Sequence, residues 1–172
     1  MDKSMIRLWV FAIALLISSC GTPTSSEALF AATVPVRMDD ELYLELVEIE
    51  YSFFGQPSVV LILENRSNES FWFPQPAYGT RIFTFSESDS AWVEVGEQYF
   101  IDLSEEEADI LVPQGQEGHS STLVVVHPDI PANNNEPVTL RIVVVGKVYK
   151  NGVPAGEEVG NYIDVTLQPP EP

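Results

Sequence analysis

The sequence predicts an all-β domain built as a sandwich of two sheets and about seven strands. No stretch after Cys20 repeats its apolar residues with the period of a helix. The apolar residues instead alternate with polar ones, or form short runs rich in Val and Ile that Gly, Pro, Asn and Ser bound. Turn signals recur about every eight to twelve residues, which is typical of sandwich folds.

The first strand is predicted at Leu42–Tyr51. Its apolar side chains change faces after Leu46, which requires a bulge or a change of sheet partner. The nearly continuous apolar run Ser58–Glu64 is expected in the middle of a sheet. Asn65–Ser70 is a polar turn, and the next strand begins at Phe71.

The middle of the chain contains a predicted hairpin and one further strand. Arg81–Phe85 and Ala91–Val95 are expected to pair across the polar turn Ser86–Ser90, and Thr122–Val126 forms another strand. The only helical candidate is Ser104–Asp109, because a Ser cap followed by acids suits the first turn of a helix.

The clearest strand is predicted at Val138–Val148. Five of its apolar residues fall on one face, namely Val138, Leu140, Ile142, Val144 and Val148. Asn151-Gly152 then predicts a two-residue type I′ turn. A final strand alternates at Ile163, Val165 and Leu167.

The N-terminus has the features of an export signal. Lys3 and Arg7 precede the unbroken apolar run Leu8–Ile17, and small residues follow. The run has ten residues, whereas a helix that spans a bilayer needs about twenty, so a permanent transmembrane anchor is not expected.

The four residues Ile17, Ser18, Ser19 and Cys20 resemble the lipobox of bacterial lipoproteins, in which an aliphatic residue and two small residues precede an invariant cysteine. The resemblance implies that a diacylglycerol is attached to the Cys20 thiol, that the chain is cleaved before Cys20, and that the new amino group is acylated. Two or more acyl chains anchor a protein stably. We therefore expect an exported protein that is lipid-anchored to the surface of the cell membrane or the outer membrane. The alternative is an ordinary secretory signal with an incidental cysteine.

The predicted organisation has four parts. They are a helical signal peptide at 1–19, lipidated Cys20 with a flexible tether at 20–35, the sandwich domain at 36–168, and a tail at 169–172. The strand pattern resembles immunoglobulin-like domains of bacterial lipoproteins, through Val59–Phe71, Leu140–Tyr149 and Asn161–Leu167. It departs from antibody domains because Cys20 is the only cysteine, so no disulfide can join the sheets.

The charge of the chain excludes one class of partner. There are 26 acidic residues against 8 Lys plus Arg, and removal of residues 1–19 leaves a net charge of -19. Nucleic acid is not expected to bind, because binding requires clustered cations that neutralise phosphates. Anionic lipid headgroups would also repel the domain, so the lipid on Cys20 is expected to attach it to the membrane.

The most unusual segment is Phe71–Tyr78. On a strand, Phe71 and Phe73 face one way and Trp72 faces the other, and the same parity argument turns Trp92 away from its apolar neighbours. Trp72, Tyr78 and Trp92 are therefore a candidate binding face for a sugar ring or a partner protein. The alternative is that loops or the N-terminal segment cover these rings.

An acidic cluster is a weaker candidate for a metal site. Carboxylates of Asp102, Glu105, Glu106 and Asp109 are the type of ligand that calcium prefers. The spacing is not that of an EF-hand, and a solvated loop explains the same residues.

No catalytic motif is present in the sequence. The only histidines are His119 and His127, and the serines next to His119, Ser120 and Ser121, do not make a triad by being adjacent. We therefore expect a non-catalytic envelope module without a cofactor, whose partner is a protein or a glycan. The alternatives are a hydrolase with an unrecognised site and a calcium-stabilised structural domain.

Overall fold

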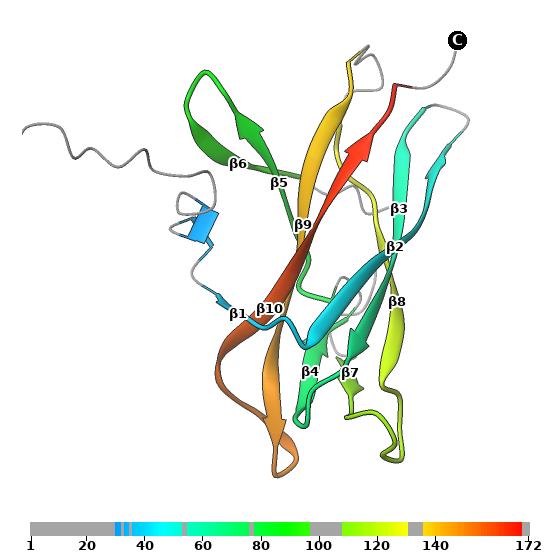
Figure 1. The fold of residues 1–172 in the computed structure, drawn as a ribbon, viewed down its shortest axis with the longest axis vertical. Helices are drawn as coiled ribbons and strands as arrows, with labels where there is room; N and C mark the ends of the chain where they lie inside the picture. Colours follow the sequence, from blue (N-terminus) through cyan, green and yellow to red (C-terminus); the bar gives the residue numbers. More distant parts are fainter. Residues whose placement is uncertain are drawn as a thin grey trace, which may run out of the picture.

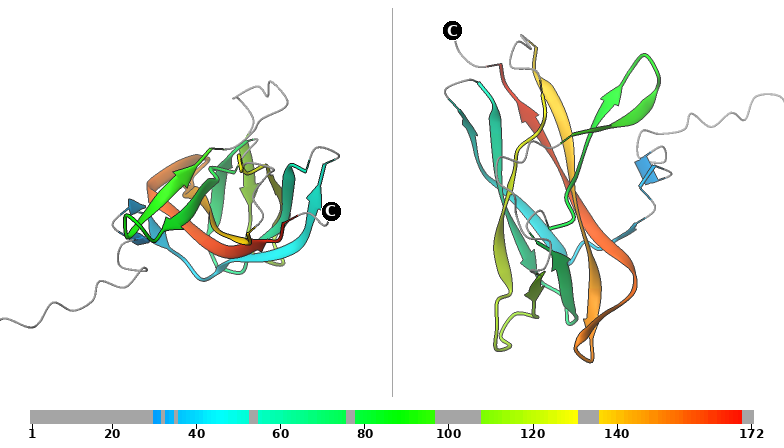
Figure 2. Two further views of the ribbon diagram at one scale, coloured as in Figure 1. Left: turned by 90° about the horizontal axis from the view of Figure 1, so that it is seen from above. Right: turned by 180° about the vertical axis from the view of Figure 1, so that it is seen from behind.

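The structure is a computed structural model that describes residues 30–31, 33–34, 36–52, 55–75, 78–96, 108–130 and 136–169. In this part of the chain, ten strands form one sheet of seven strands and one of three. We call them the large sheet and the small sheet, and Figures 1 and 2 show that they lie face to face. The expectation of an all-β domain with two sheets is confirmed, with more strands than the seven or so predicted.

The large sheet is organised around one long hairpin, β9 (Val138–Lys150) and β10 (Val153–Leu167). The short strand β1 (Arg37–Met38) lies parallel to β10 at one edge. On its other side β9 pairs with two strands in succession, which are β4 (Ser70–Pro74) and β5 (Arg81–Ser86). Two outer strands complete the branches: β7 (Ala108–Leu111) beside β4, and β6 (Ala91–Val95) beside β5. The large sheet therefore forks at β9, with the two branches toward opposite ends of that strand (Figure 1).

The connection between β4 and β5 runs beside the same edge of β9 with which both strands pair. Trp72 pairs with Lys147, whereas Arg81 pairs with Val143. Between these two ladders the Val145 N–H donates a hydrogen bond of 3.4 Å to the carbonyl of Tyr78. Gly79 has a φ of +59°, and a Cβ there would lie 2.2 Å from the Val145 carbonyl oxygen. Only glycine therefore fits at this position of the connection.

The small sheet consists of β2 (Leu42–Tyr51), β3 (Pro57–Asn65) and β8 (Ser121–Val126), with β3 in the middle. β3 contains the apolar run Ser58–Glu64, so its predicted position in the middle of a sheet is confirmed. The register of β2 against β3 shifts between Leu46 and Glu48, where the sequence predicted a bulge.

The β9–β10 hairpin confirms one local prediction and corrects the length of another. Asn151 and Gly152 have φ angles of 55° and 82°, as a type I′ turn requires. The strand predicted to begin near Ile163 begins at Val153 instead. Its first half is mostly exposed and does not alternate clearly, so pairing with β9 rather than burial holds it extended.

The predicted helix Ser104–Asp109 conflicts with β7. Ala108 and Asp109 lie in this strand, where they pair with β4. Residues 104–107 lie outside the described residues. Backbone pairing with a neighbouring strand overrides the capping signal at this end of the segment.

The described residues before β1, 30–31 and 33–34, are called the N-terminal segment. This segment packs on the outer face of the large sheet, which is the face turned away from the small sheet. Phe30 and Val34 are 2 % and 1 % exposed and form a second apolar cluster with Phe83 and Val143. The Val34 N–H donates to the Phe30 carbonyl at 2.9 Å, a hydrogen bond of helical spacing. The packed domain thus includes Phe30, six residues before the boundary predicted at residue 36.

Candidate functional site

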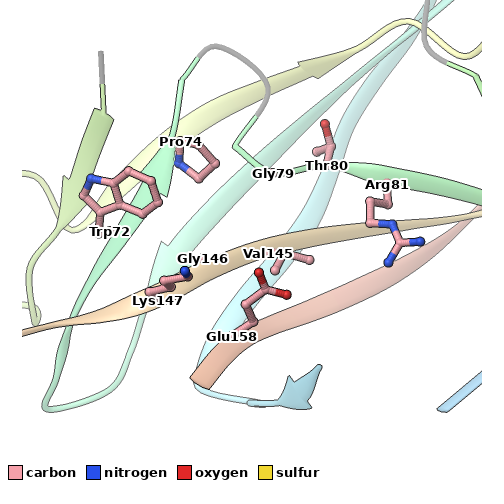
Figure 3. A pocket seen from close by; sticks show the side chains of 9 residues that line it. All are labelled: Trp72, Pro74, Gly79, Thr80, Arg81, Val145, Gly146, Lys147 and Glu158. Atoms are coloured by element: carbon pink, nitrogen blue, oxygen red, sulfur yellow. The ribbon is translucent and has the colours of Figure 1, made fainter. Parts of the chain in front are cut away.

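A cavity of about 310 Å³ lies at the fork of the large sheet. Figure 3 shows Trp72 and Pro74 of β4 at one end and Arg81 of β5 at the other, with Glu158 of β10 between them. The backbone of β9 at Val145–Lys147 forms its floor. The cavity therefore exists because β4 and β5 diverge where they leave β9.

Strand alternation places Trp72 at this cavity. Phe71 and Phe73 are fully buried between the sheets, so Trp72 between them points to the outer face and is half-buried there. Its backbone pairs with Ile110 of β7 on one side and with Lys147 of β9 on the other. The indole is thus carried by a strand that is fixed on both edges.

Four charged groups lie around the cavity. Arg81 and Glu94 form a salt bridge, and Lys147 and Glu158 are the other two. Arg81 donates two hydrogen bonds to Glu94, of 2.9 and 2.8 Å. The hydrogen bond to Glu94 is the main cause that raises the pKa of Arg81, and the same bond lowers the pKa of Glu94. Lys147 and Glu158 are opposite each other across β9 and β10, and no described residue lies within ion-pair distance of either one. The charge of Glu158 still acts on Arg81, since it helps to raise the pKa of that guanidinium.

The structure separates the three aromatic residues of the predicted binding face. Tyr78 is 8 % exposed and lies in the core between the sheets, where its hydroxyl is 2.9 Å from the Thr122 hydroxyl and donates to Asp109 at 3.3 Å. Trp92 packs edge-on against Phe30 at 5.3 Å and is half-buried, and it also lines a second recess beside β5 and β9. Of the three, Trp72 is the one at the cavity, and its role in binding stays a prediction.

The apolar cluster of Phe30, Val34, Phe83 and Val143 on the outer face of the large sheet lies beside a buried arginine, which was not predicted from the sequence. Arg141 is 3 % exposed and donates two hydrogen bonds of 2.7 Å to Asp164. Its guanidinium carbon also lies 4.0, 4.5 and 4.7 Å from the ring centroids of Tyr162, Trp92 and Phe30. These contacts stabilise the attachment of the N-terminal segment, because a buried cation needs both a counter-charge and close neighbours.

The remaining predicted sites are only partly described. Asp109 lies on β7, whereas Asp102, Glu105 and Glu106 lie outside the described residues, as do Cys20 and the lipobox residues Ile17, Ser18 and Ser19. In the described ranges, no group of three His, Cys, Asp or Glu residues is arranged to hold a metal ion. Calcium binding therefore stays a hypothesis.

The two histidines lie at opposite ends of β8. His119 is exposed and precedes this strand, and His127 is half-buried and follows it. A strand of six residues is about 20 Å long at about 3.3 Å per residue, so the two imidazoles do not share one site.

No protein-family model matches this chain, and no curated protein matches its sequence. The function is therefore inferred from the residues themselves. Within the described part of the chain, no helix has the length and apolar character needed to cross a membrane.

Arg81, Lys147 and Glu158 were not predicted from the sequence as residues of the candidate site. Pro74 and Gly79 did signal an interruption after β4. Nothing in the local pattern placed Lys147 opposite Glu158, because that pairing depends on a hairpin register that passes a bulge between Ala155 and Glu158.

Proposed function

We propose that the protein is an exported lipoprotein whose two-sheet domain is a non-catalytic binding module at the surface of a bacterial envelope. Its anchor would be a lipid on Cys20, as the lipobox-like residues imply. The finer fold assignment, an immunoglobulin-like sandwich of the kind found in bacterial lipoproteins, is part of the same proposal. Nine residues separate Cys20 from Phe30, and a fully extended chain of that length reaches about 30 Å. The module would therefore work close to the membrane.

The cavity at the fork carries the binding part of the proposal. It combines an indole on a strand fixed at both edges with an ammonium and a carboxylate that have no described ion pair. Ligand sites typically occupy about 300–1,000 Å³ and combine apolar or aromatic walls with a few polar groups.

Fractionation of cells that express the full chain tests the anchor. The wild type and the control variant Ser18→Ala, which keeps a small residue in the lipobox, should incorporate a palmitate analogue and sediment with membranes. Cys20→Ser should lose the label and enter the soluble fraction, because no thiol remains for the lipid. A Cys20→Ser protein that still sediments with membranes would contradict lipid anchoring.

Retention of the wild type and of two further variants on immobilised envelope fractions tests the binding module. Trp72→Ala should reduce retention at least tenfold, because it removes the aromatic wall of the cavity. Leu123→Ala is the control, since Leu123 is 57 % exposed on the small sheet. Equal retention of the Trp72→Ala variant and the wild type would rule out this cavity as the binding site.

A further inference from the structure

We infer that the cavity at the fork binds one uncharged sugar ring of an envelope glycan, stacked on Trp72 and hydrogen-bonded by Lys147 and Glu158. This inference rests on the proposed function and specifies the ligand class of the same cavity. It follows from three properties of the described residues: the size of the cavity, the aromatic wall, and the signs of the charges of Lys147 and Glu158.

The size of the cavity favours a small ring over a folded partner. Its volume of about 310 Å³ is at the lower end of the range for small-molecule sites, about 300–1,000 Å³. A stable protein interface instead buries about 800 Å² on each partner, which the nine residues lining this cavity cannot provide. A sugar unit within a chain can enter such a recess while its neighbours stay in solvent.

The aromatic wall matches the apolar face of a pyranose. One face of the ring presents C–H groups, and the hydroxyl groups project from its rim. Trp72 offers a large apolar surface with Pro74 beside it (Figure 3). Because β7 and β9 hold the backbone of Trp72 on both sides, stacking costs little further ordering of the protein.

The charged groups of Lys147 and Glu158 suit the hydroxyl groups of the same sugar ring. The ammonium of Lys147 only donates hydrogen bonds and the carboxylate of Glu158 only accepts them. Adjacent hydroxyl groups both donate and accept, so this pair can satisfy two of them at once. Arg81 contributes less, since its guanidinium already donates two hydrogen bonds to Glu94.

The charge balance selects an uncharged sugar over an anion. Lys147 would attract a phosphate or a carboxylate, but Glu158 opposite it on β10 weakens that attraction, and Glu94 does the same for Arg81. The chain as a whole carries a net charge of -18, which further disfavours anionic ligands. A nucleotide, a phosphosugar and a uronic acid polymer are thus poorer matches than a hexose or an N-acetylhexosamine.

Titration of the full chain with defined sugars tests the inference. The probes are glucose, N-acetylglucosamine and the β-1,4-linked trisaccharide of each, with inorganic phosphate and glucuronate as charged comparisons. The detergent must carry no sugar headgroup. The indole N–H resonance of Trp72, assigned by its absence in Trp72→Phe, should shift in a saturable manner with at least one uncharged sugar and not with phosphate or glucuronate.

Variants then locate the contacts. Trp72→Ala should weaken sugar binding at least tenfold. Lys147→Gln and Glu158→Gln should each weaken it about fivefold, because a neutral amide forms a weaker hydrogen bond than a charged group. Leu123→Ala should bind as the wild type does. Glu158 is exposed, so Glu158→Gln keeps the test valid if Trp72→Ala fails to fold.

The outcomes separate this inference from the proposed function. If no sugar binds, or phosphate binds more tightly than any sugar, the inference is wrong. The proposed module still stands in that case if envelope retention depends on Trp72, because its ligand is then another molecule. If retention on envelope fractions is also independent of Trp72, this cavity is not the binding site. The sugar inference and the binding part of the proposed function are then both wrong.

Discussion

Replacing Phe30 with Ala removes the ring that joins the N-terminal segment to the large sheet. Phe30 is 2 % exposed, and its ring centroid lies 5.5 Å from Phe83, 5.3 Å from Trp92 and 5.5 Å from Tyr162. The guanidinium of Arg141 also lies 4.7 Å from it. Truncation would therefore leave a space beside a buried cation as well as removing apolar contacts.

The expected cost can be worked from these contacts. Replacing a buried Phe by Ala lowers the free energy of unfolding by about 3–5 kcal/mol. The segment that carries Phe30 is short and can settle partly into the space, which favours the lower figure, about 3 kcal/mol. Domains of this size are stable by about 5–15 kcal/mol, so the variant should still fold but with a clearly reduced margin.

Urea denaturation followed by tryptophan fluorescence measures this cost. The midpoint should fall by about 1–3 M with an unchanged slope, because typical slopes are about 1–3 kcal/mol per molar urea. Emission from Trp92 should also shift to longer wavelength as water reaches its ring.

A control variant shows whether the loss is specific. Leu123→Ala on the exposed face of the small sheet should change the free energy of unfolding by no more than about 0.5 kcal/mol. If Phe30→Ala is equally mild, the segment is a loose tether and the packing argument is refuted.

Two further variants test other parts of the fold. Asn65 is fully buried and its amide donates to two backbone carbonyls at 2.8 and 3.0 Å, so Asn65→Ala should lower the free energy of unfolding by about 2–3 kcal/mol. Chemical denaturation checks this, and a loss below about 1 kcal/mol would contradict the assigned hydrogen bonds. Arg81 lowers the pKa of Glu94, so their pairing should add stability above the ordinary pKa of Glu and lose it as pH falls through the lowered value. Glu94→Gln should therefore be less stable than the wild type at neutral pH by less than about 1 kcal/mol, since the pair is half-exposed, and the difference should vanish once the pH falls below the lowered pKa of Glu94. A difference that is independent of pH would show that the charge of Glu94 does not contribute.

Features encoded within a few neighbouring residues were predictable from the sequence. The change of apolar parity at Leu46 required the bulge that the register shows, and Asn151-Gly152 required its hairpin turn. The alternation in Val138–Val148 identified a strand and the face that it buries between the sheets. The lipobox-like residues before Cys20 are likewise a local signal, and they alone support the proposal of a lipid anchor.

The tertiary structure decided which side chains meet. Tyr78 and Trp92 gave similar signals in the sequence, yet Tyr78 is in the core between the sheets and Trp92 packs half-buried against Phe30 on the outer face. Lys147 and Glu158 come together with Trp72 because β4 and β10 pair with opposite edges of β9. The pairing of β4 with β9 joins residues more than seventy positions apart in the sequence. Local periodicity sets which face a side chain takes, but strand register and the fork in the sheet set its neighbours, and those depend on the packing of the whole chain.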